Sequence, residues 1–477
     1  MNEYDQYDAL GLAQLVRTKQ VTPSELLSAA MQRAEKAQAE LNCFSALFPE
    51  MAQEAIDDGL PDGPFKGVPF AVKDLGVAIK GAPLTNGSKA FKDNRPDYDG
   101  VLATRYREAG LSLFGQTTTP EFGLTTTTES QLFGQTRNPW DTSRTSGGSS
   151  GGASASVAAG VIPVAHASDG GGSIRIPAAC TGLFGMKPSR GRTPTGPLTT
   201  EGWNGQSVNH VVSRSVRDSA ALLDLTHGPE TGSRYVAPPP EASFLSALDN
   251  DPRPLKIALW TTAPNGTQPD ADAQAGIDAT RKLLEDLGHT VVEAGPQIDG
   301  EALGKGIMMT ISAAMAMIME IRGEMLGRKL DPDDMEPVTA RFVEFGNTIP
   351  MAELMKANQA SITAGIVFDH FMDVGGFDLT LSPTLSRKPE KLGVLSLNPT
   401  DFDAYGEAVT TFAPWCAVFN QIGSPAMSVP LHWTDDNLPL GMMFGAKCGQ
   451  ERLLYALAGQ LERAAPWTHR RPPVWVG

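Results

Sequence analysis

The sequence predicts an α/β fold built on a mixed or mainly parallel β-sheet. Short apolar runs bounded by glycine and proline, which are typical of buried strands, alternate along the chain with segments of helical periodicity. Residues 104–109 have a helical pattern and residues 111–114 the pattern of a strand, and the same order recurs at 153–159 and 161–165. Alternation of this kind is typical of sheets whose strands are connected through helices.

We expect the whole chain, residues 1–477, to form one domain. Its 477 residues are 41% hydrophobic and 19% charged, which is typical of a globular protein with a large core. Length alone suggests two or three domains, but no proline- or serine-rich linker and no run of charge divides the sequence. Within this domain we expect a helical region to about residue 60, a core over about 61–225 and a variable region over about 300–350.

Three segments can be assigned to particular elements. Residues 22–25 (TPSE) have the form of a capping box with proline at the first helical position, so a helix should begin here and continue to about residue 39. Residues 66–73 have the pattern of a buried strand that ends at Lys73, and open α/β sheets bind ligands at this end of their strands. Residues 307–325 are rich in methionine and helical in period, which more often indicates core packing than a substrate pocket.

The charge of the chain argues against several kinds of partner. The net charge is −15, the sequence pI is about 5.0, and lysine and arginine are scattered singly, so we expect no nucleic acid and no anionic membrane surface as a partner. The acidic N-terminus does not resemble a secretory signal, and the alanine-rich stretches are too short or too interrupted to span a bilayer. We therefore expect a cytoplasmic protein.

The cysteines and histidines give no support for a metal or a cofactor. Four cysteines, at positions 43, 180, 416 and 448, are widely spaced without a C-x-x-C pair, and we expect them to be buried thiols. None of the seven histidines lies in an H-E-x-x-H or similar cluster. The working hypothesis is a mechanism without metal and without cofactor.

Two glycine-rich segments carry the strongest chemical signal. They are residues 145–152 (TSGGSSGG) and 168–178 (SDGGGSIRIPA), and each has a serine beside a run of glycines. Glycine lets other groups approach the main chain closely, as a cradle of N–H groups for an anion requires. The second segment continues into a helix expected near Ile174, whose free N–H groups and dipole favour negative charge at Ser173.

Other interpretations of these segments stay open at this point. An isolated GGSSGG is about as often a flexible linker as a site. Phosphate-binding loops are also glycine-rich, but neither segment ends in the lysine that such loops use. Residues 147–151 match G-x-S-x-G, the nucleophile elbow, which requires a strand directly before the serine. Residues 138–145 have the composition of a loop, so we interpret this match as accidental.

The stretch over residues 138–178 resembles the signature of the amidase signature family. That pattern is G-G-S-S-G-G followed by D-x-G-G-S-I-R-x-P-A, with 24 residues from serine to serine, and Ser149 and Ser173 have this spacing. Lys73 matches the family's upstream lysine in a V-K-D context. Late blocks also match, namely residues 419–426 (FNQIGSPA), residues 438–443 (LPLGMM) and an expected helix over 452–464, so the resemblance covers nearly the whole chain.

This resemblance implies a central mixed β-sheet flanked by helices on both faces, and an enzyme that hydrolyses carboxylic amides. Ser173 is then the acylated nucleophile, and Ser149, which follows a cis peptide bond in the family, bridges Ser173 to Lys73. The main chain at Gly170, Gly171 and Gly172, together with the Ser173 N–H, forms the oxyanion hole.

The chemistry of these residue types agrees with such roles. A serine hydroxyl needs a base to take its proton. Lysine can be that base only when neutral, so burial must lower its pKa strongly from about 10.4. Ser150 is expected to support the relay, and Asp169 and Arg175 to order the loop rather than contact substrate.

Two positions depart from the family pattern. Ser146 stands where many members have proline, and Ser168 stands where threonine is usual. We expect neither change to touch the proton relay.

The form of residues 168–178 and 187–192 (KPSRGR) is more similar to free-standing hydrolases of aryl, fatty or nylon-oligomer amides than to a tRNA amidotransferase subunit. We therefore expect a small-molecule amide substrate, with pocket walls from residues 195–207 and 304–348, and leave esterase activity and a homodimer open. The alternative is a glutamine-dependent amidotransferase subunit, although such a complex should show basic patches. A catalytically silent binding protein on the same scaffold is a third possibility.

Overall fold

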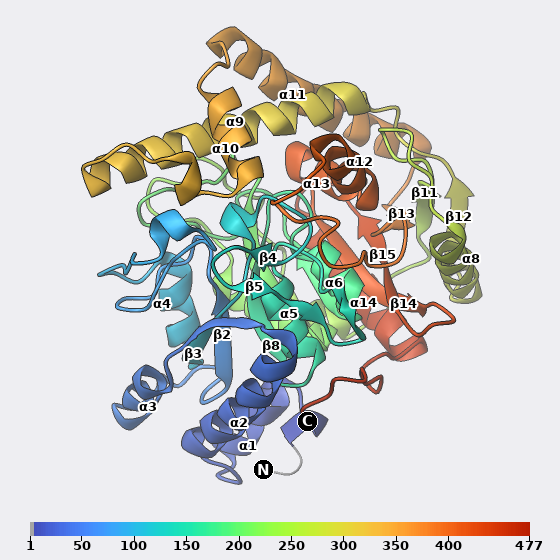
Figure 1. Ribbon diagram of the computed structural model, residues 1–477. Coiled ribbons are helices and arrows are strands. Elements are labelled where there is room, and N and C mark those ends of the chain that lie inside the picture. The colour runs from blue at the N-terminus through green and yellow to red at the C-terminus, as the bar shows by residue number, and fades with distance from the viewer. Residues whose placement is uncertain (1–3) are drawn as a thin grey trace.

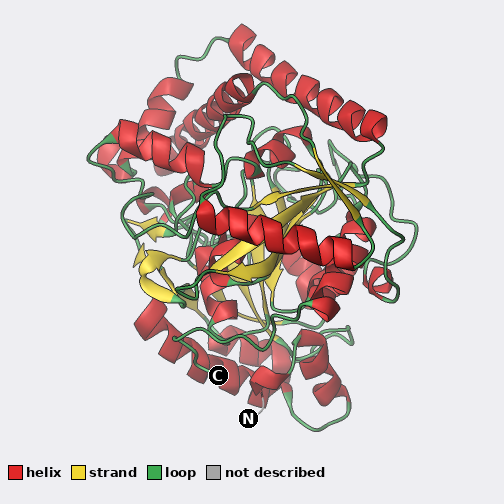
Figure 2. Ribbon diagram, turned by 90° about the vertical axis from the view of Figure 1, so that its right-hand side faces the viewer, coloured by secondary structure: helices red, strands yellow, loops and turns green. Residues whose placement is uncertain are grey.

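The computed structural model describes residues 4–477 and confirms the α/β fold, with fourteen α-helices among these residues. Residues 1–3, the start of the acidic stretch in which we expect no secretory signal, lie outside the described residues. Figure 2 shows the strands enclosed between helices, as the family resemblance implies.

The main sheet has eight strands. In spatial order they are β12 (Thr290–Glu293), β11 (Lys256–Leu259), β13 (Leu379–Pro383), β15 (Pro439–Gly445), β14 (Ala426–Trp433), β9 (Phe184–Lys187), β10 (Val208–Ser213) and β8 (Val164–Asp169). β11 pairs in parallel with β12 and with β13, and the other five neighbouring pairs are antiparallel. The sheet is therefore mixed, with antiparallel pairs in the majority.

A second sheet of three strands adjoins the β8 edge of the main sheet. Its order is β1 (Phe44–Leu47), β3 (Ser112–Thr117) and β2 (Pro69–Lys73), and β2 pairs in parallel with β3. β2 lies against β8, and the two are labelled side by side in the lower half of Figure 1. The expected strand that ends at Lys73 is confirmed, and all five of its residues are buried.

The helices predicted from capping and periodicity are present. α2 (Pro23–Leu41) begins with the expected capping box, in which the Glu25 N–H donates to Thr22 Oγ1 at 3.2 Å and the Thr22 N–H donates to Glu25 Oε2 at 2.8 Å. α4 (Val101–Glu108) precedes β3, and α5 (Gly151–Ala158) precedes β8, in the predicted alternation. α6 (Arg175–Thr181) begins directly after Ile174, where the sequence places it.

One expectation about a loop is wrong. Residues 138–145 belong mostly to a small antiparallel hairpin of β6 (Arg137–Asn138) and β7 (Asp141–Thr145). The segment contains β-branched threonines, which favour extended backbone, and Asn138 holds the turn because its Oδ1 accepts the Trp140 N–H at 3.0 Å. A similar short hairpin joins β4 (Glu129–Ser130) to β5 (Gly134–Gln135).

Helices cover the main sheet and bury its core. α6 packs against β9, β14 and β15, and large apolar side chains of the strands and of the surrounding helices form one continuous cluster. α1 (Ala9–Arg17) and α3 (Pro49–Asp57) pack beside the three-stranded sheet. The remaining helices of the main-sheet part are α7 (Val216–Thr226), α8 (Ala271–Asp286), α12 (Phe402–Phe412), α13 (Cys416–Ile422) and α14 (Glu451–Ala464).

Three further helices form a separate layer, seen at the top of Figure 1. They are α9 (Gly300–Leu326), α10 (Pro337–Gly346) and α11 (Met351–Gly375), and α9 contacts both of the others. The methionine-rich stripe of α9 is divided, because Met315 and Met319 are buried whereas Met317 and Met325 are exposed. Among the described residues α9 is the one helix long and apolar enough to cross a membrane by length and composition, and 39% of its most apolar window is buried inside the fold.

Candidate active site

The ends of two adjacent strands and two loops bring the predicted catalytic residues together. Lys73 ends β2, and Ser168 and Asp169 end β8 beside it. The loop between β7 and α5 supplies Ser149, and the loop between β8 and α6 supplies Ser173. The site therefore lies where the two sheets meet, at the carboxyl ends of β2 and β8.

The Lys73 side chain is buried and bonded to two hydroxyl groups. Its Nζ donates to Ser149 Oγ at 2.7 Å and to Ser168 Oγ at 3.0 Å. Burial lowers the pKa of Lys73 to about 7, against a smaller opposing effect of the Asp169 carboxylate. The amine is thus neutral in a substantial fraction of molecules near neutral pH, as a base must be.

The contact with Ser168 corrects one expectation. Ser168 departs from the usual threonine, and we expected this change to leave the relay untouched, yet its hydroxyl binds the lysine directly. Serine retains the hydroxyl group that threonine would offer, so the chemistry of the contact is preserved. Ser150 supports this arrangement, since its hydroxyl accepts the Ser168 N–H at 3.3 Å and donates to the Ser168 carbonyl at 3.2 Å.

The two serines differ in their surroundings. Ser149 is 2% exposed and follows a cis peptide bond from Gly148, as the family resemblance implies. Ser173 is half-buried, and its hydroxyl has no protein partner among residues 4–477, including Ser149. Catalytic hydrogen bonds are often long before substrate binds. A nucleophile elbow presents an exposed serine, so the buried Ser149 does not fit the G-x-S-x-G interpretation.

The main chain beside Ser173 offers three free N–H groups. Those of Gly170, Gly171 and Ser173 donate to no other protein group within the described part of the chain. The Gly172 N–H, which we expected to share in the oxyanion hole, instead donates to Asp169 Oδ1 at 2.7 Å. Gly172 has φ 128°, and a Cβ there would lie 2.6 Å from Ile176, so glycine is required for the shape of the loop.

A buried ion pair fixes this loop. Arg175 donates from Nε and Nη2 to the two oxygens of Asp169, both at 2.9 Å, and neither side chain is exposed. The Asp169 carboxylate also accepts the Ile174 N–H at 3.1 Å. Burial alone would raise the pKa of Asp169, but the Arg175 guanidinium outweighs it and holds the pKa well below its usual range. These contacts join both residues to the loop, and their supporting role stays a prediction.

Asn420 is a member of this network to which the sequence analysis assigned no role. Its Nδ2 donates to the carbonyl and to Oδ1 of Asp169, both at 2.9 Å, and its Oδ1 accepts from Arg175 at 2.7 Å. The signal that could have identified it is the match of residues 419–426 to F-N-x-x-G-x-P-A, in which Asn420 is the fixed polar position.

Side chains from both variable stretches reach the catalytic loop. Trp203, from residues 195–207, lies so close that a Cβ at Gly170 would be 2.6 Å from its ring. Ile307, from residues 304–348, would be 3.8 Å from a Cβ at Gly171. Phe122 forms a cluster with Met315 and Met319 of α9, and Trp203 packs against it. The surroundings of Ser173 on this side are therefore apolar.

The cysteines only partly match the expectation of buried thiols. Cys43, Cys180 and Cys416 are buried, but Cys448 is exposed because it follows β15 in a turn at the surface. Within residues 4–477 no group of three or more His, Cys, Asp or Glu side chains is arranged to hold a metal ion.

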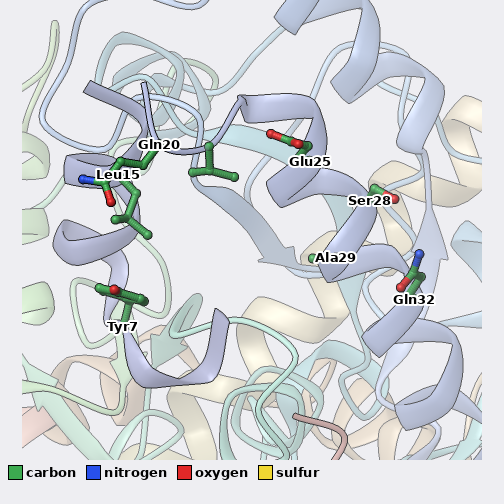
Figure 3. A pocket seen from close by; sticks show the side chains of 8 residues that line it. Tyr7, Leu15, Gln20, Glu25, Ser28, Ala29 and Gln32 are labelled. Atoms are coloured by element: carbon green, nitrogen blue, oxygen red, sulfur yellow. The ribbon is translucent and has the colours of Figure 1, made fainter. Parts of the chain in front are cut away.

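A hollow of about 460 Å³ lies elsewhere, between α1 and α2 (Figure 3). Its lining includes Tyr7, Gln20 and Ser28, and its carboxylate, Glu25, is engaged in the capping box of α2. It offers no activated base and none of the glycine-rich main chain found beside Ser173, so it is not a second catalytic site.

Comparisons with known proteins identify the family of the chain. The amidase family model matches residues 25–455. A 6-aminohexanoate-cyclic-dimer hydrolase of Pseudomonas sp. (strain NK87) is 35% identical over 477 residues, covering 98% of this chain and 96% of the relative.

Two solved structures are similar along almost their whole length. A 6-aminohexanoate cyclic dimer hydrolase in complex with substrate has a TM-score of 0.93 and 34% identity, covering 98% of this chain and 99% of that one. A bacterial aryl acylamidase has a TM-score of 0.87 and 28% identity, covering 97% of each chain. The family model matches most of the chain and the Pseudomonas relative is 35% identical over 98% of it, so the chain belongs to the amidase signature family.

Proposed function

We propose that this amide hydrolase acts through an acyl-enzyme on Ser173, with Ser149 and Lys73 as proton relay, and that it prefers apolar linear or cyclic amides such as amide oligomers. The observation that carries the mechanism is the 2.7 Å contact between the Lys73 amine and Ser149 Oγ at a buried strand end. No metal ion or cofactor takes part in the proposed reaction.

In the first step the neutral Lys73 amine accepts the proton of Ser149 while Ser149 accepts the proton of Ser173. The Ser173 oxygen then attacks the amide carbonyl carbon, and the carbonyl oxygen becomes an anion. We expect the free N–H groups of Gly170, Gly171 and Ser173 to bind that anion, aided by the N-terminus of α6.

Collapse of the tetrahedral intermediate breaks the C–N bond, and the leaving nitrogen takes the proton back through Ser149 from Lys73. A water molecule then attacks the acyl ester, giving its proton to the relay. The carboxylic acid leaves as the ester bond to Ser173 breaks, and the serine hydroxyl is restored by the same proton. The relay ends each half of the reaction in its starting state.

The choice of substrate rests on two supports. The relative with 35% identity is a 6-aminohexanoate-cyclic-dimer hydrolase, and the aryl acylamidase structure covers 97% of this chain. The side chains that approach the catalytic loop, including Trp203 and Ile307, are apolar and carry no charge to pair with a charged acyl group. Apolar walls favour long methylene chains or aryl rings over small charged amides.

The test is a substrate panel measured as kcat/KM. Linear and cyclic oligomers of 6-aminohexanoate and anilides of medium-chain acids should be cleaved more efficiently than acetamide or glutamine. A preference for glutamine, or activity only with a partner chain, would instead support the amidotransferase subunit. Trp203→Ala should reduce the preference for apolar acyl groups, whereas the distant surface variant Lys282→Ala should leave the ranking unchanged.

A further inference from the structure

The seam between the two sheets contains a buried histidine. β2 is the edge strand of the three-stranded sheet and β8 is the edge strand of the main sheet, and the two lie side by side without pairing as a ladder. His166, in the middle of β8, is fully buried at this seam. Its ring contacts the main chain of β2 across the seam.

The ring connects both sheets. Nδ1 accepts the main-chain N–H of Lys73 at 3.2 Å, and Nε2 lies 3.3 Å from Oδ1 of Asn209 in β10. A nitrogen that accepts from an N–H carries no proton, so Nδ1 is unprotonated and Nε2 donates to the Asn209 oxygen. The imidazole is therefore neutral, in the tautomer with the proton on Nε2.

Lys73 is held at two points by one strand. Side chains two residues apart on a strand point to the same face, and His166 and Ser168 both face Lys73. His166 binds the lysine's main chain and Ser168 binds its amine. The position of Lys73 Nζ relative to Ser149 thus depends on two side chains of β8, of which only Ser168 belongs to a recognised motif.

The charged and titratable groups around this contact are few. Burial lowers the pKa of His166 to about 3, with a further lowering from Lys73. His210 of β10 lies near enough to act in the same direction, and the Tyr106 ring of α4 packs at 6.0 Å from the imidazole. Asp169 is the carboxylate that acts on Lys73. The ring stays neutral at every pH at which Lys73 titrates.

We propose that His166 is a positioning residue for amide hydrolysis, whose Nδ1 holds the main chain of Lys73 across the seam and thereby sets the contact of Lys73 Nζ with Ser149. The proposal rests on the proposed function, in which Lys73 is the base. A second consequence is that the ring fills the seam and keeps water away from the lysine.

Two substitutions of His166 separate the roles of its two ring nitrogens. In His166→Asn the amide oxygen can take the place of Nδ1 and accept from Lys73, whereas in His166→Gln the longer side chain reaches toward Asn209 and leaves the Lys73 N–H without an acceptor. We expect kcat of His166→Gln on an amide to fall on the order of 10- to 100-fold with little change in KM, as for a displaced catalytic group. The acid limb of its pH profile, which is the fall in activity as Lys73 becomes protonated, should move to higher pH. The reason is that a less desolvated lysine has a higher pKa. His166→Asn should stay close to the wild type in both respects.

His289 provides a matched control. It is also buried, its Nδ1 accepts the Leu255 N–H at 3.0 Å, and its Nε2 lies 2.8 Å from Gln460 Oε1. His289→Gln therefore removes the same kind of contact beside β11, away from Ser173. It should lower stability without moving kcat or the acid limb.

The outcomes distinguish this proposal from the proposed function. If a fluorophosphonate fails to label Ser173 in the wild type, the proposed function is wrong. If the wild type is labelled but His166→Gln keeps its kcat and its acid limb, or if His166→Asn loses as much as His166→Gln, the positioning role alone is wrong. Should His166→Gln not fold, Asn209→Ala tests the same ring from its other side. In Asn209→Ala the acid limb should also move to higher pH, and an unmoved limb would overturn the proposal.

Discussion

Lys73 Nζ lies 3.0 Å from the hydroxyl of Ser168, so the lysine has a second hydroxyl partner beside Ser149. This partner orients the amine, because two hydrogen bonds fix its direction where one would allow rotation. Position 168 is therefore part of the environment of the base, although the sequence pattern shows only a common serine-for-threonine exchange.

Removing this hydroxyl should slow the enzyme without stopping it. Loss of one neutral hydrogen bond is worth about 1 kcal/mol, so Ser168→Ala should lower kcat on an amide by about fivefold. Ser168→Thr keeps the hydroxyl and should retain activity close to the wild type. Steady-state kinetics of the two variants check this, and equal activity of Ser168→Ala and the wild type would mean that the contact has no role in turnover.

The position of the acyl group can be tested directly. Ser173→Ala should abolish acyl-enzyme formation and leave the fold intact, because the half-buried hydroxyl has no protein partner to lose. Mass spectrometry of peptides after reaction with a fluorophosphonate should place the adduct on Ser173. An adduct on Ser149 would favour the elbow interpretation and reverse the two roles.

The sequence predicts those parts of the site that depend on local pattern. The strand that ends at Lys73, the helix after Ile174 and the spacing of Ser149 and Ser173 are all local, and the structure contains each of them. The mixed sheet is predicted only coarsely, because the antiparallel pairs of the main sheet join segments far apart in the chain.

Contacts between distant segments are what sequence reasoning misses here. Asn420 reaches Asp169 from 251 residues away, and His166 meets Lys73 across 93 residues. The family resemblance implies that the Gly172 N–H belongs to the oxyanion hole, whereas in the structure the carboxylate of Asp169 takes that donor. Only the three-dimensional arrangement shows which donors stay free.

The buried ion pair of the catalytic loop should be important for stability. Arg175→Met leaves the Asp169 carboxylate buried without its partner, which should cost about 3–5 kcal/mol of unfolding free energy. The exposed pair of Lys282 and Asp286 is the control, since Lys282→Ala should cost only about 0–1 kcal/mol. Denaturant unfolding of both variants measures the difference, and a small loss in Arg175→Met would show that the loop is held mainly by Asn420 and the main chain.

Activity should survive exhaustive chelation. The mechanism assigns every proton transfer to Lys73 and the serines, and the described residues contain no cluster of metal-ligating side chains. Dialysis against a strong chelator followed by an amidase assay checks this. Loss of activity that zinc or manganese restores would require a different account of the site.

The acid limb of the pH profile should report Lys73. Burial lowers the pKa of this lysine to about 7, so it is protonated as the pH falls below that value and can no longer accept a proton. Activity on an amide should therefore rise with pH through about 7 and level off above it. Two buried neighbours could imitate this limb, because burial raises the pKa of Asp74 to about 6 and lowers that of Lys187 to about 7. Asp74→Asn and Lys187→Met should therefore leave the limb in place.

Lys73→Ala completes the test. It should remove the limb and lower amide turnover more than ester turnover, because an amine leaving group needs a proton from the relay and an alkoxide needs it less. Equal losses on both substrates would keep Lys73 as the base but remove its role in protonating the leaving group. Full amidase activity in Lys73→Ala would show that another group takes the Ser173 proton, and the relay through Ser149 would then be wrong.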